Sequence, residues 1–309
     1  MIFKTEFKGE EAIKLENEQL RVIILPKLGG KVASLYSKVK DFELVFQNKE
    51  DKYKEVKVYS DFGSFDASGF DDAFPSINAS MVKVDNLDVK YPNHGEIWSA
   101  RLSYMIKDGK IELYFNSSIL SYYYKKSISL KDDRIKIEYE IINTGESDLP
   151  CIWTAHYLVN CDEEMILLFP ENTCKVINVT NSSCLGSLNK IHSYPISKDL
   201  SGEKYCLNRI YSKSAKKCEK YYIYGGLTKG ECGIYYPHKD LTYKLYFDKN
   251  IFPYLGFWVT EGGFRGDYNC ALEPSNGFYD GINIAEENNK LFVLTAGKTL
   301  KFNMEIELT

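Results

Sequence analysis

The pattern of β-strands is clearest in residues 101–141, and this pattern restricts the fold more than any other feature of the sequence. In the clearest run, charged residues separate Ile135, Ile137, Tyr139 and Ile141. Side chains on a β-strand point alternately to the two faces of its sheet, so this run predicts a strand with one buried face and one wet face. An Asp108-Gly109 pair between the apolar stretches 102–106 and 111–115 predicts a hairpin turn.

Short strand-like stretches occur along most of the chain, and no segment has the period of a helix of three or more turns. Tyr and Phe, which favour the pleated surface of a sheet, number 24 and 17 among the 309 residues. We expect a long loop at 51–68 and loops with short strands at 160–220. No repeat or linker divides the sequence. Together these observations predict an all-β fold, a single large antiparallel sandwich or barrel that forms one domain over residues 1–309.

The charge pattern argues against a nucleic-acid partner, because the net charge is −4 and no long basic run occurs. The densest basic patch, 213–220, includes Glu219 and is interpreted as a solvated loop. The sequence does not start with a signal peptide, and no apolar run approaches membrane-spanning length. We therefore expect a cytoplasmic protein with no membrane partner. The 8 cysteines form no Cys-x-x-Cys pair, which predicts reduced thiols and no metal site.

The stretch 268–283 is the first candidate for a functional site. Glu273 follows a short apolar strand, 270–272, and Pro274 is expected to end that strand because proline has no N–H to donate to a sheet. Glu273 is therefore predicted at a sheet edge or rim, where solvent or a ligand can reach it. An ordinary strand end with a surface carboxylate explains the same pattern.

Three further positions carry side chains suited to proton transfer or ligand binding. Asp71 and Asp72 are adjacent, so on an extended chain at most one of them faces a given pocket, and a solvated loop explains them equally well. His94 lies in a turn, where a lone histidine is more often structural. His156 lies in the apolar stretch 151–159, which is typical of a strand buried on both faces. A buried histidine needs a hydrogen-bond partner or a chemical task.

Four segments together resemble the galactose mutarotase (aldose 1-epimerase) family, in that family's order. They are Gly69-Phe70-Asp71-Asp72-Ala73-Phe74-Pro75, Asn93-His94-Gly95, Trp153-Thr154-Ala155-His156-Tyr157, and Leu272-Glu273-Pro274 with Asp280-Gly281-Ile282-Asn283. The resemblance covers nearly the whole chain and places it in a divergent branch of the family. It implies an all-β, galactose mutarotase-like β-supersandwich with a sugar cleft on one sheet, and it implies neither a metal nor a cofactor.

The resemblance also implies roles for individual residues. Glu273 matches the general base that takes the proton from the anomeric hydroxyl, His156 matches the general acid that protonates the ring oxygen, and His94 matches the second histidine near the anomeric centre. These residue types suit the reaction, because a carboxylate is ionised at neutral pH and a histidine can hold or release its proton there. The candidates for sugar binding are Asp71, Asp72, Asn93, Trp98, Tyr157 and Trp258.

Departures from the best-known family members leave three functions open. Residues 70–72 contain no arginine, and no sugar-binding aspartate motif is found after Tyr221. The first function is an isomerase that interconverts the α and β anomers of a free aldose. The second is a hexose 6-phosphate 1-epimerase, for which Arg101, Arg209 and Arg265 are the candidate phosphate ligands. The third is a non-catalytic protein that binds or senses carbohydrate. A small-molecule sugar is the expected partner in each case. The protein itself is expected to be a monomer or a homodimer.

Overall fold

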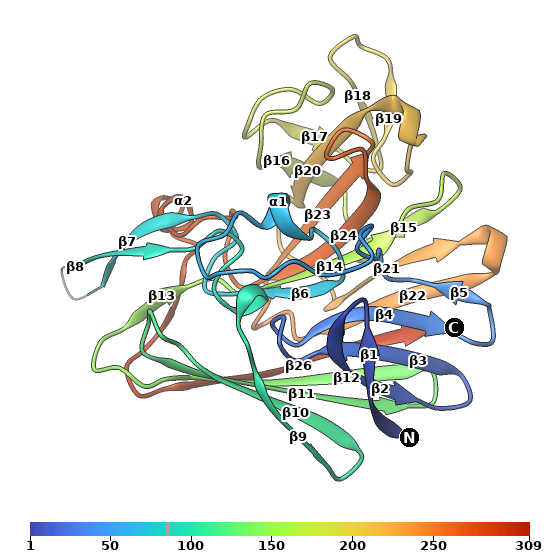
Figure 1. Cartoon of the computed structure of the whole chain (residues 1–309). Helices are drawn as coiled ribbons and strands as arrows, with labels where there is room; N and C mark the ends of the chain where they lie inside the picture. The colour runs from blue at the N-terminus through green and yellow to red at the C-terminus, as the bar shows by residue number, and fades with distance from the viewer. Residues whose placement is uncertain (85–86) are drawn as a thin grey trace.

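The computed structural model describes residues 1–84 and 87–309, which form two large sheets packed against each other (Figure 1). The larger sheet has the strand order β1 (Ile2–Phe7), β2 (Glu10–Glu16), β3 (Leu20–Leu25), β4 (Lys31–Ser37), β6 (Phe70–Ala73), β14 (Thr154–Asn160), β24 (Tyr268–Ser275), β23 (Tyr254–Glu261), β20 (Lys217–Ile223), β16 (Lys175–Asn178) and β17 (Ile191–Ser193), with β5 (Phe42–Glu43) beside β4. The second sheet has the order β15 (Ile166–Leu168), β21 (Glu231–Tyr236), β22 (Leu241–Phe247), β26 (Thr299–Leu308), β12 (Arg134–Asn143), β11 (Tyr122–Lys131), β10 (Lys110–Asn116) and β9 (Ser103–Lys107). The strands pair antiparallel throughout these described residues, which confirms the predicted fold class.

Smaller elements connect and flank the sheets. Three two-stranded sheets pair β13 (Leu149–Cys151) with β25 (Phe292–Leu294), β18 (Ile196–Lys198) with β19 (Lys204–Cys206), and β7 (Ser80–Val84) with β8 (Leu87–Tyr91). The helices are α1 (Phe62–Phe65) and α2 (Ile282–Glu287), with 3-10 turns η1 (Ile97–Ser99), η2 (Lys213–Ala215) and η3 (Pro237–Lys239). Within 1–84 and 87–309, no helix has the length and apolar character needed to span a membrane.

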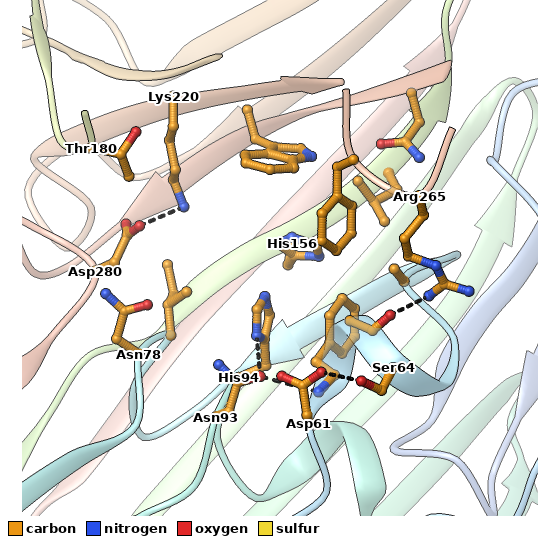
Figure 2. Close-up of a pocket in the computed structure, with 18 residues that line it drawn as sticks. Asp61, Ser64, Asn78, Asn93, His94, His156, Thr180, Lys220, Arg265 and Asp280 are labelled. Carbon is orange, nitrogen blue, oxygen red and sulfur yellow. Dashed lines mark hydrogen bonds and ion pairs between the residues drawn. The ribbon is translucent and has the colours of Figure 1, made fainter. Parts of the chain in front are cut away.

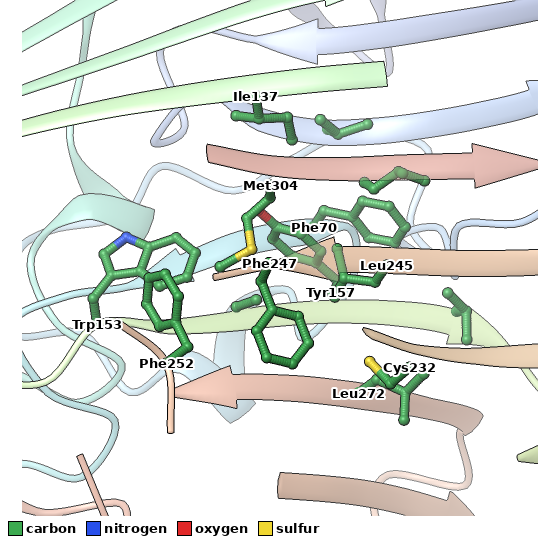
Figure 3. Close-up of a cluster of buried hydrophobic side chains, with 14 of the residues drawn as sticks. Phe70, Ile137, Trp153, Tyr157, Cys232, Leu245, Phe247, Phe252, Leu272 and Met304 are labelled. Atoms are coloured by element: carbon green, nitrogen blue, oxygen red, sulfur yellow. The ribbon is translucent and has the colours of Figure 1, made fainter. Parts of the chain in front are cut away.

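Side chains from both large sheets form the main hydrophobic core (Figure 3). Phe70, Tyr157 and Leu272 come from the larger sheet, and Ile137 and Met304 come from the second. The predicted alternation of β12 is confirmed over residues 135–141, where the apolar residues are buried and the charged residues between them are exposed or partly exposed. The period of two therefore decides which face of each strand joins the core.

Strands from the later part of the sequence lie in the middle of each large sheet. In the larger sheet β24 lies between β14 and β23, and in the second sheet β26 lies between β22 and β12. Candidate residues on β14 and β24 are therefore in neighbouring strands. Glu273 lies inside the larger sheet rather than at an edge, and its side chain is fully buried.

Local turn chemistry predicts some boundaries and misses others. Asp108 and Gly109 form the predicted hairpin turn between β9 and β10, both with positive φ. The expectation that Pro274 ends its strand is wrong, because β24 continues to Ser275. Pro274 is opposite Leu255 on β23, while the pairing of β14 with β24 is interrupted at this point, where proline has no N–H to offer. The predicted long loop at 51–68 contains one helical turn, α1.

Candidate active site

A cavity of about 510 Å³ lies against the larger sheet and is closed on one side by α1 (Figure 2). Aromatic side chains in its wall are Phe62, Trp258 and Phe264. Its polar lining includes Asp61, Ser64, Asn78, Asn93, His94, His156, Thr180, Lys220, Asn269, Arg265 and Asp280. A concave site with aromatic walls and a few charged groups is typical of small-molecule binding.

Two histidines lie together in the cavity wall. The ring centroids of His94 and His156 are 4.9 Å apart, and Phe62 of α1 stacks on His94 with a centroid distance of 4.1 Å. Asn93 supports this arrangement, since its Oδ1 lies 3.2 Å from His94 Nδ1 and accepts a hydrogen bond from the Phe62 backbone N–H. Burial and the positive charges of Lys220 and Lys31 lower the pKa of His94 to about 3. Burial also holds the pKa of His156 well below its usual value, so both imidazoles are neutral at pH 7.

A buried group of charges lies next to His156. The Glu273 carboxylate has one oxygen 3.7 Å from His156 Nε2 and the other 2.9 Å from Lys220 Nζ. Lys220 Nζ is also 2.8 Å from Asp280, which accepts a hydrogen bond of 2.9 Å from the Tyr222 hydroxyl. Burial raises the pKa of Glu273, and the Lys220 ammonium opposes that rise. Asp280 raises the pKa of Glu273 as well, because it is a second negative charge.

Comparisons of sequence and structure identify relatives with this fold. The sequence profile of a family described as a domain of unknown function, DUF5107, matches residues 3–279. The chain belongs to this family. No curated protein matches it.

Several solved structures are similar to this DUF5107 chain over nearly all of its length. A galactose mutarotase-like protein from Lactobacillus casei ATCC 334 is 17% identical with a TM-score of 0.71, and the match covers 96% of this chain and 100% of that one. A galactose mutarotase-like protein from Clostridium acetobutylicum is 16% identical with a TM-score of 0.69, covering 100% and 98%. The Slr1438 protein from Synechocystis sp. PCC 6803 is 14% identical with a TM-score of 0.72, covering 99% of both chains. The predicted galactose mutarotase-like fold is thereby confirmed.

The two adjacent aspartates of the DUF5107 chain face opposite sides of β6. Asp71 is directly opposite His156 in the neighbouring strand and forms an ion pair with the buried Lys31. Burial raises the pKa of Asp71 to about 7. Asp72 points into the core, where Lys126 Nζ is 2.7 Å away and the hydroxyl of Tyr139 donates a hydrogen bond of 2.8 Å. As expected for an extended chain, only one of the pair lies on the side of the cavity.

The remaining predicted residues divide between the cavity and its surroundings. Asn93 and Trp258 line the cavity together with His94 and His156. Tyr157 lies in the core, where its hydroxyl is 2.7 Å from that of Tyr139. Trp98 packs beneath α1 and donates a hydrogen bond of 2.9 Å to the Asn93 carbonyl, so it supports the wall from behind. Glu273 does not line the cavity itself; it lies behind the lining residues His156 and Lys220, and its carboxylate contacts both of them.

Sequence reasoning missed the Lys220–Asp280 pair. The interpretation of 213–220 as a solvated loop is wrong for Glu219 and Lys220, which are buried on β20. No local signal distinguishes Lys220 from its lysine-rich neighbours, because the acids that pair with it come from β24 and the loop that follows. The position of Asp280 in the fourth matching segment was the one available indication.

Proposed function

We propose that this chain is an aldose 1-epimerase-like (mutarotase-like) isomerase, which interconverts the α and β anomers of an aldose. One observation carries the proposal: Glu273 and His156 approach to 3.7 Å beside a cavity of about 510 Å³. Ring opening requires one proton to leave O1 and one to reach the ring oxygen O5, and a paired carboxylate and imidazole can handle both. The galactose mutarotase-like fold supports the same conclusion by analogy.

The proposed mechanism assigns Glu273 as the base and His156 as the acid. Glu273 takes the O1 proton and passes it to the neutral His156, and as His156 receives this proton it gives one to O5, which breaks the bond between C1 and O5 and leaves an aldehyde. Glu273 is close enough to His156 Nε2 to return a proton to it, so neither group keeps a net change. The aldehyde then rotates about the bond between C1 and C2, and reversal of the steps closes the ring on its other face. His94, next to His156, is assigned to bind the sugar near C1.

The decisive experiment measures anomer exchange by NMR with galactose, glucose, an amino sugar and glucose 6-phosphate. We expect the wild-type protein to accelerate exchange of at least one of them and Glu273→Gln to lose roughly 10²- to 10⁴-fold of that acceleration. Glu261→Gln is the matched control, because Glu261 is a buried glutamate on the neighbouring strand β23 that accepts a hydrogen bond from the Tyr211 backbone. Its activity should stay close to wild type.

Two results would count against this function. A loss smaller than about tenfold in Glu273→Gln would remove Glu273 from the chemistry. Saturable sugar binding without faster exchange by the wild-type protein would instead support the non-catalytic carbohydrate-binding function.

A phosphorylated hexose is the second candidate substrate, because Arg265 lines the cavity. One guanidinium N–H donates to the Gly63 carbonyl at 2.7 Å, and its fork of donors suits a phosphate. Arg101 and Arg209, the other candidates, are exposed and lie outside the cavity lining. We expect a phosphate requirement to appear as tighter binding of glucose 6-phosphate than of glucose, lost in Arg265→Gln and retained in Arg101→Gln.

A further inference from the structure

Lys220 is an unusual group for the wall of a cavity, because it is a cation almost removed from water. Its side chain is 7% exposed, and its ammonium bridges two carboxylates, with Nζ 2.9 Å from Glu273 and 2.8 Å from Asp280. In Figure 2 the side chain reaches across the cavity wall towards Asp280. The proposed mechanism uses neither Lys220 nor Asp280, so the reason for this buried triad is open.

The surroundings of Glu273 show which groups can control its charge. On one side, β20 provides Lys220 and Tyr222, and the Tyr222 hydroxyl is bonded to Asp280. On the other side, β14 provides His156, which is neutral at pH 7. The facing residue of β23 is Gly256, which provides no side chain. Lys220 is thus the positive charge in contact with this carboxylate among the described residues.

Gly256 shows how closely the strands approach here. A Cβ at this position would lie 2.9 Å from the Tyr222 ring and 3.2 Å from a Glu273 oxygen. On the side of Gly256, the Tyr222 ring therefore fills the space beside the Glu273 carboxylate. A fully buried carboxylate without a cation or hydrogen-bond donor favours its protonated form.

We propose that Lys220 is a positioning residue that keeps Glu273 ionised and directed at His156, and that Asp280 weakens this effect by sharing the same ammonium. The inference concerns the charge of Glu273, and it rests on the proposed function only for its consequence, that the rate depends on this charge. Lys220 then lowers the pH at which Glu273 becomes protonated, and Asp280 raises it. Loss of the cation disfavours the carboxylate, whereas loss of the second anion favours it.

The test measures the protonation of Glu273 directly. Infrared spectra of wild-type protein minus Glu273→Gln isolate the C=O band of protonated Glu273, and its intensity against pH gives the midpoint. In Lys220→Met we expect the midpoint to rise by about 1–3 pH units, the usual effect of one charge at this distance. In Asp280→Asn it should fall. Lys220→Arg retains the charge and should stay near the wild-type midpoint, and Lys217→Met, on the same strand, should leave it unchanged.

Anomer exchange against pH provides the second measurement, and the acidic limb of the rate profile should move with the infrared midpoint in each variant. If Lys220→Met does not fold, the double variant Lys220→Met with Asp280→Asn removes one of the two uncompensated carboxylates and allows the same comparison. An unchanged midpoint in folded Lys220→Met overturns the inference, even if activity is lost. If the wild-type protein accelerates no sugar but the midpoint moves as expected, the inference stands and the proposed function fails.

Discussion

Two neighbouring aspartates show how strongly the surroundings decide what a single residue does. Asp71 and Asp72 have the same chemistry, yet Asp71 pairs with Lys31 on the cavity side of β6 and Asp72 pairs with Lys126 inside the core. Both lysines are almost fully buried. Each ion pair avoids the large free-energy cost of an isolated buried charge. Knowing the partner of one aspartate does not predict the partner of the other.

The Asp72 pair leads to a prediction about stability. Asp72→Ala leaves Lys126 buried without its counter-ion and removes the acceptor for the Tyr124 and Tyr139 hydroxyls, so it should cost about 3–5 kcal/mol of the free energy of unfolding. Urea denaturation measures this change. Asp88→Ala is the control, because Asp88 pairs with Lys83 at an exposed site and should change little. Equal losses in both variants would show that Asp72 does not hold Lys126.

At the scale of elements, the turn that carries His94 is fixed by the approach of two backbone segments. Gly95 forms a bridge with Phe74, and a Cβ on Gly95 would lie 2.0 Å from the Phe74 carbonyl oxygen. Backbone atoms cannot move aside as a flexible side chain can. The His94 turn is therefore fixed against Phe74, which directly follows β6, and α1 packs on the same turn through Phe62.

Gly95→Ala should therefore destabilise the protein far more than Gly109→Ala. The φ angles are similar, +77° and +75°, so left-handed backbone strain is common to both and costs about 1–2 kcal/mol. A Cβ on Gly109 meets no atom within 4 Å. The difference in melting temperature between the two variants isolates the steric contact. Similar melting temperatures would contradict the close approach at Gly95.

The sequence predicts elements well where local chemistry decides them. The Asp108-Gly109 turn and the alternation of β12 follow from neighbouring residues, and four segments in order were sufficient to predict the fold. The Pro274 and 213–220 predictions failed because distant strands determine them. Pro274 is tolerated where the pairing of β14 with β24 is interrupted, and Lys220 is buried because Glu273 and Asp280 meet it from other elements. Neighbouring residues in the sequence are enough to predict a strand. They do not predict that a charged residue is buried when its partners come from distant elements.

At the scale of the whole molecule, the cavity is lined by side chains that lie far apart in the sequence, from Asp61 to Asp280. Folding places the two neutral histidines in surroundings that disfavour their charged forms. The unfolded chain lacks those surroundings, and its histidines have ordinary pKa values of about 6.5. The site therefore makes global stability depend on pH.

The sign of this dependence follows from the lowered pKa of His94. Between pH values of about 6.5 and about 3 the unfolded chain binds a proton at this position and the folded chain does not, so the free energy of unfolding falls as the pH falls. His94→Gln should reduce the slope by up to roughly 1.4 kcal/mol per pH unit in this window. Urea denaturation at a series of pH values measures it. His238→Gln, at an exposed position, should retain the wild-type slope, and an unchanged slope in His94→Gln would be inconsistent with a neutral His94.

The central place of β26 has a consequence for how the protein is made. Synthesis proceeds from the N-terminus, so β12 and β22 leave the ribosome before residues 299–308 exist to pair with both of them. Until then the second sheet is two separate parts, each with an open edge, and the core beneath Met304 is uncovered. The nascent chain is thus especially exposed to aggregation until β26 is made, and the cavity on the opposite sheet gains a completed support only at that moment.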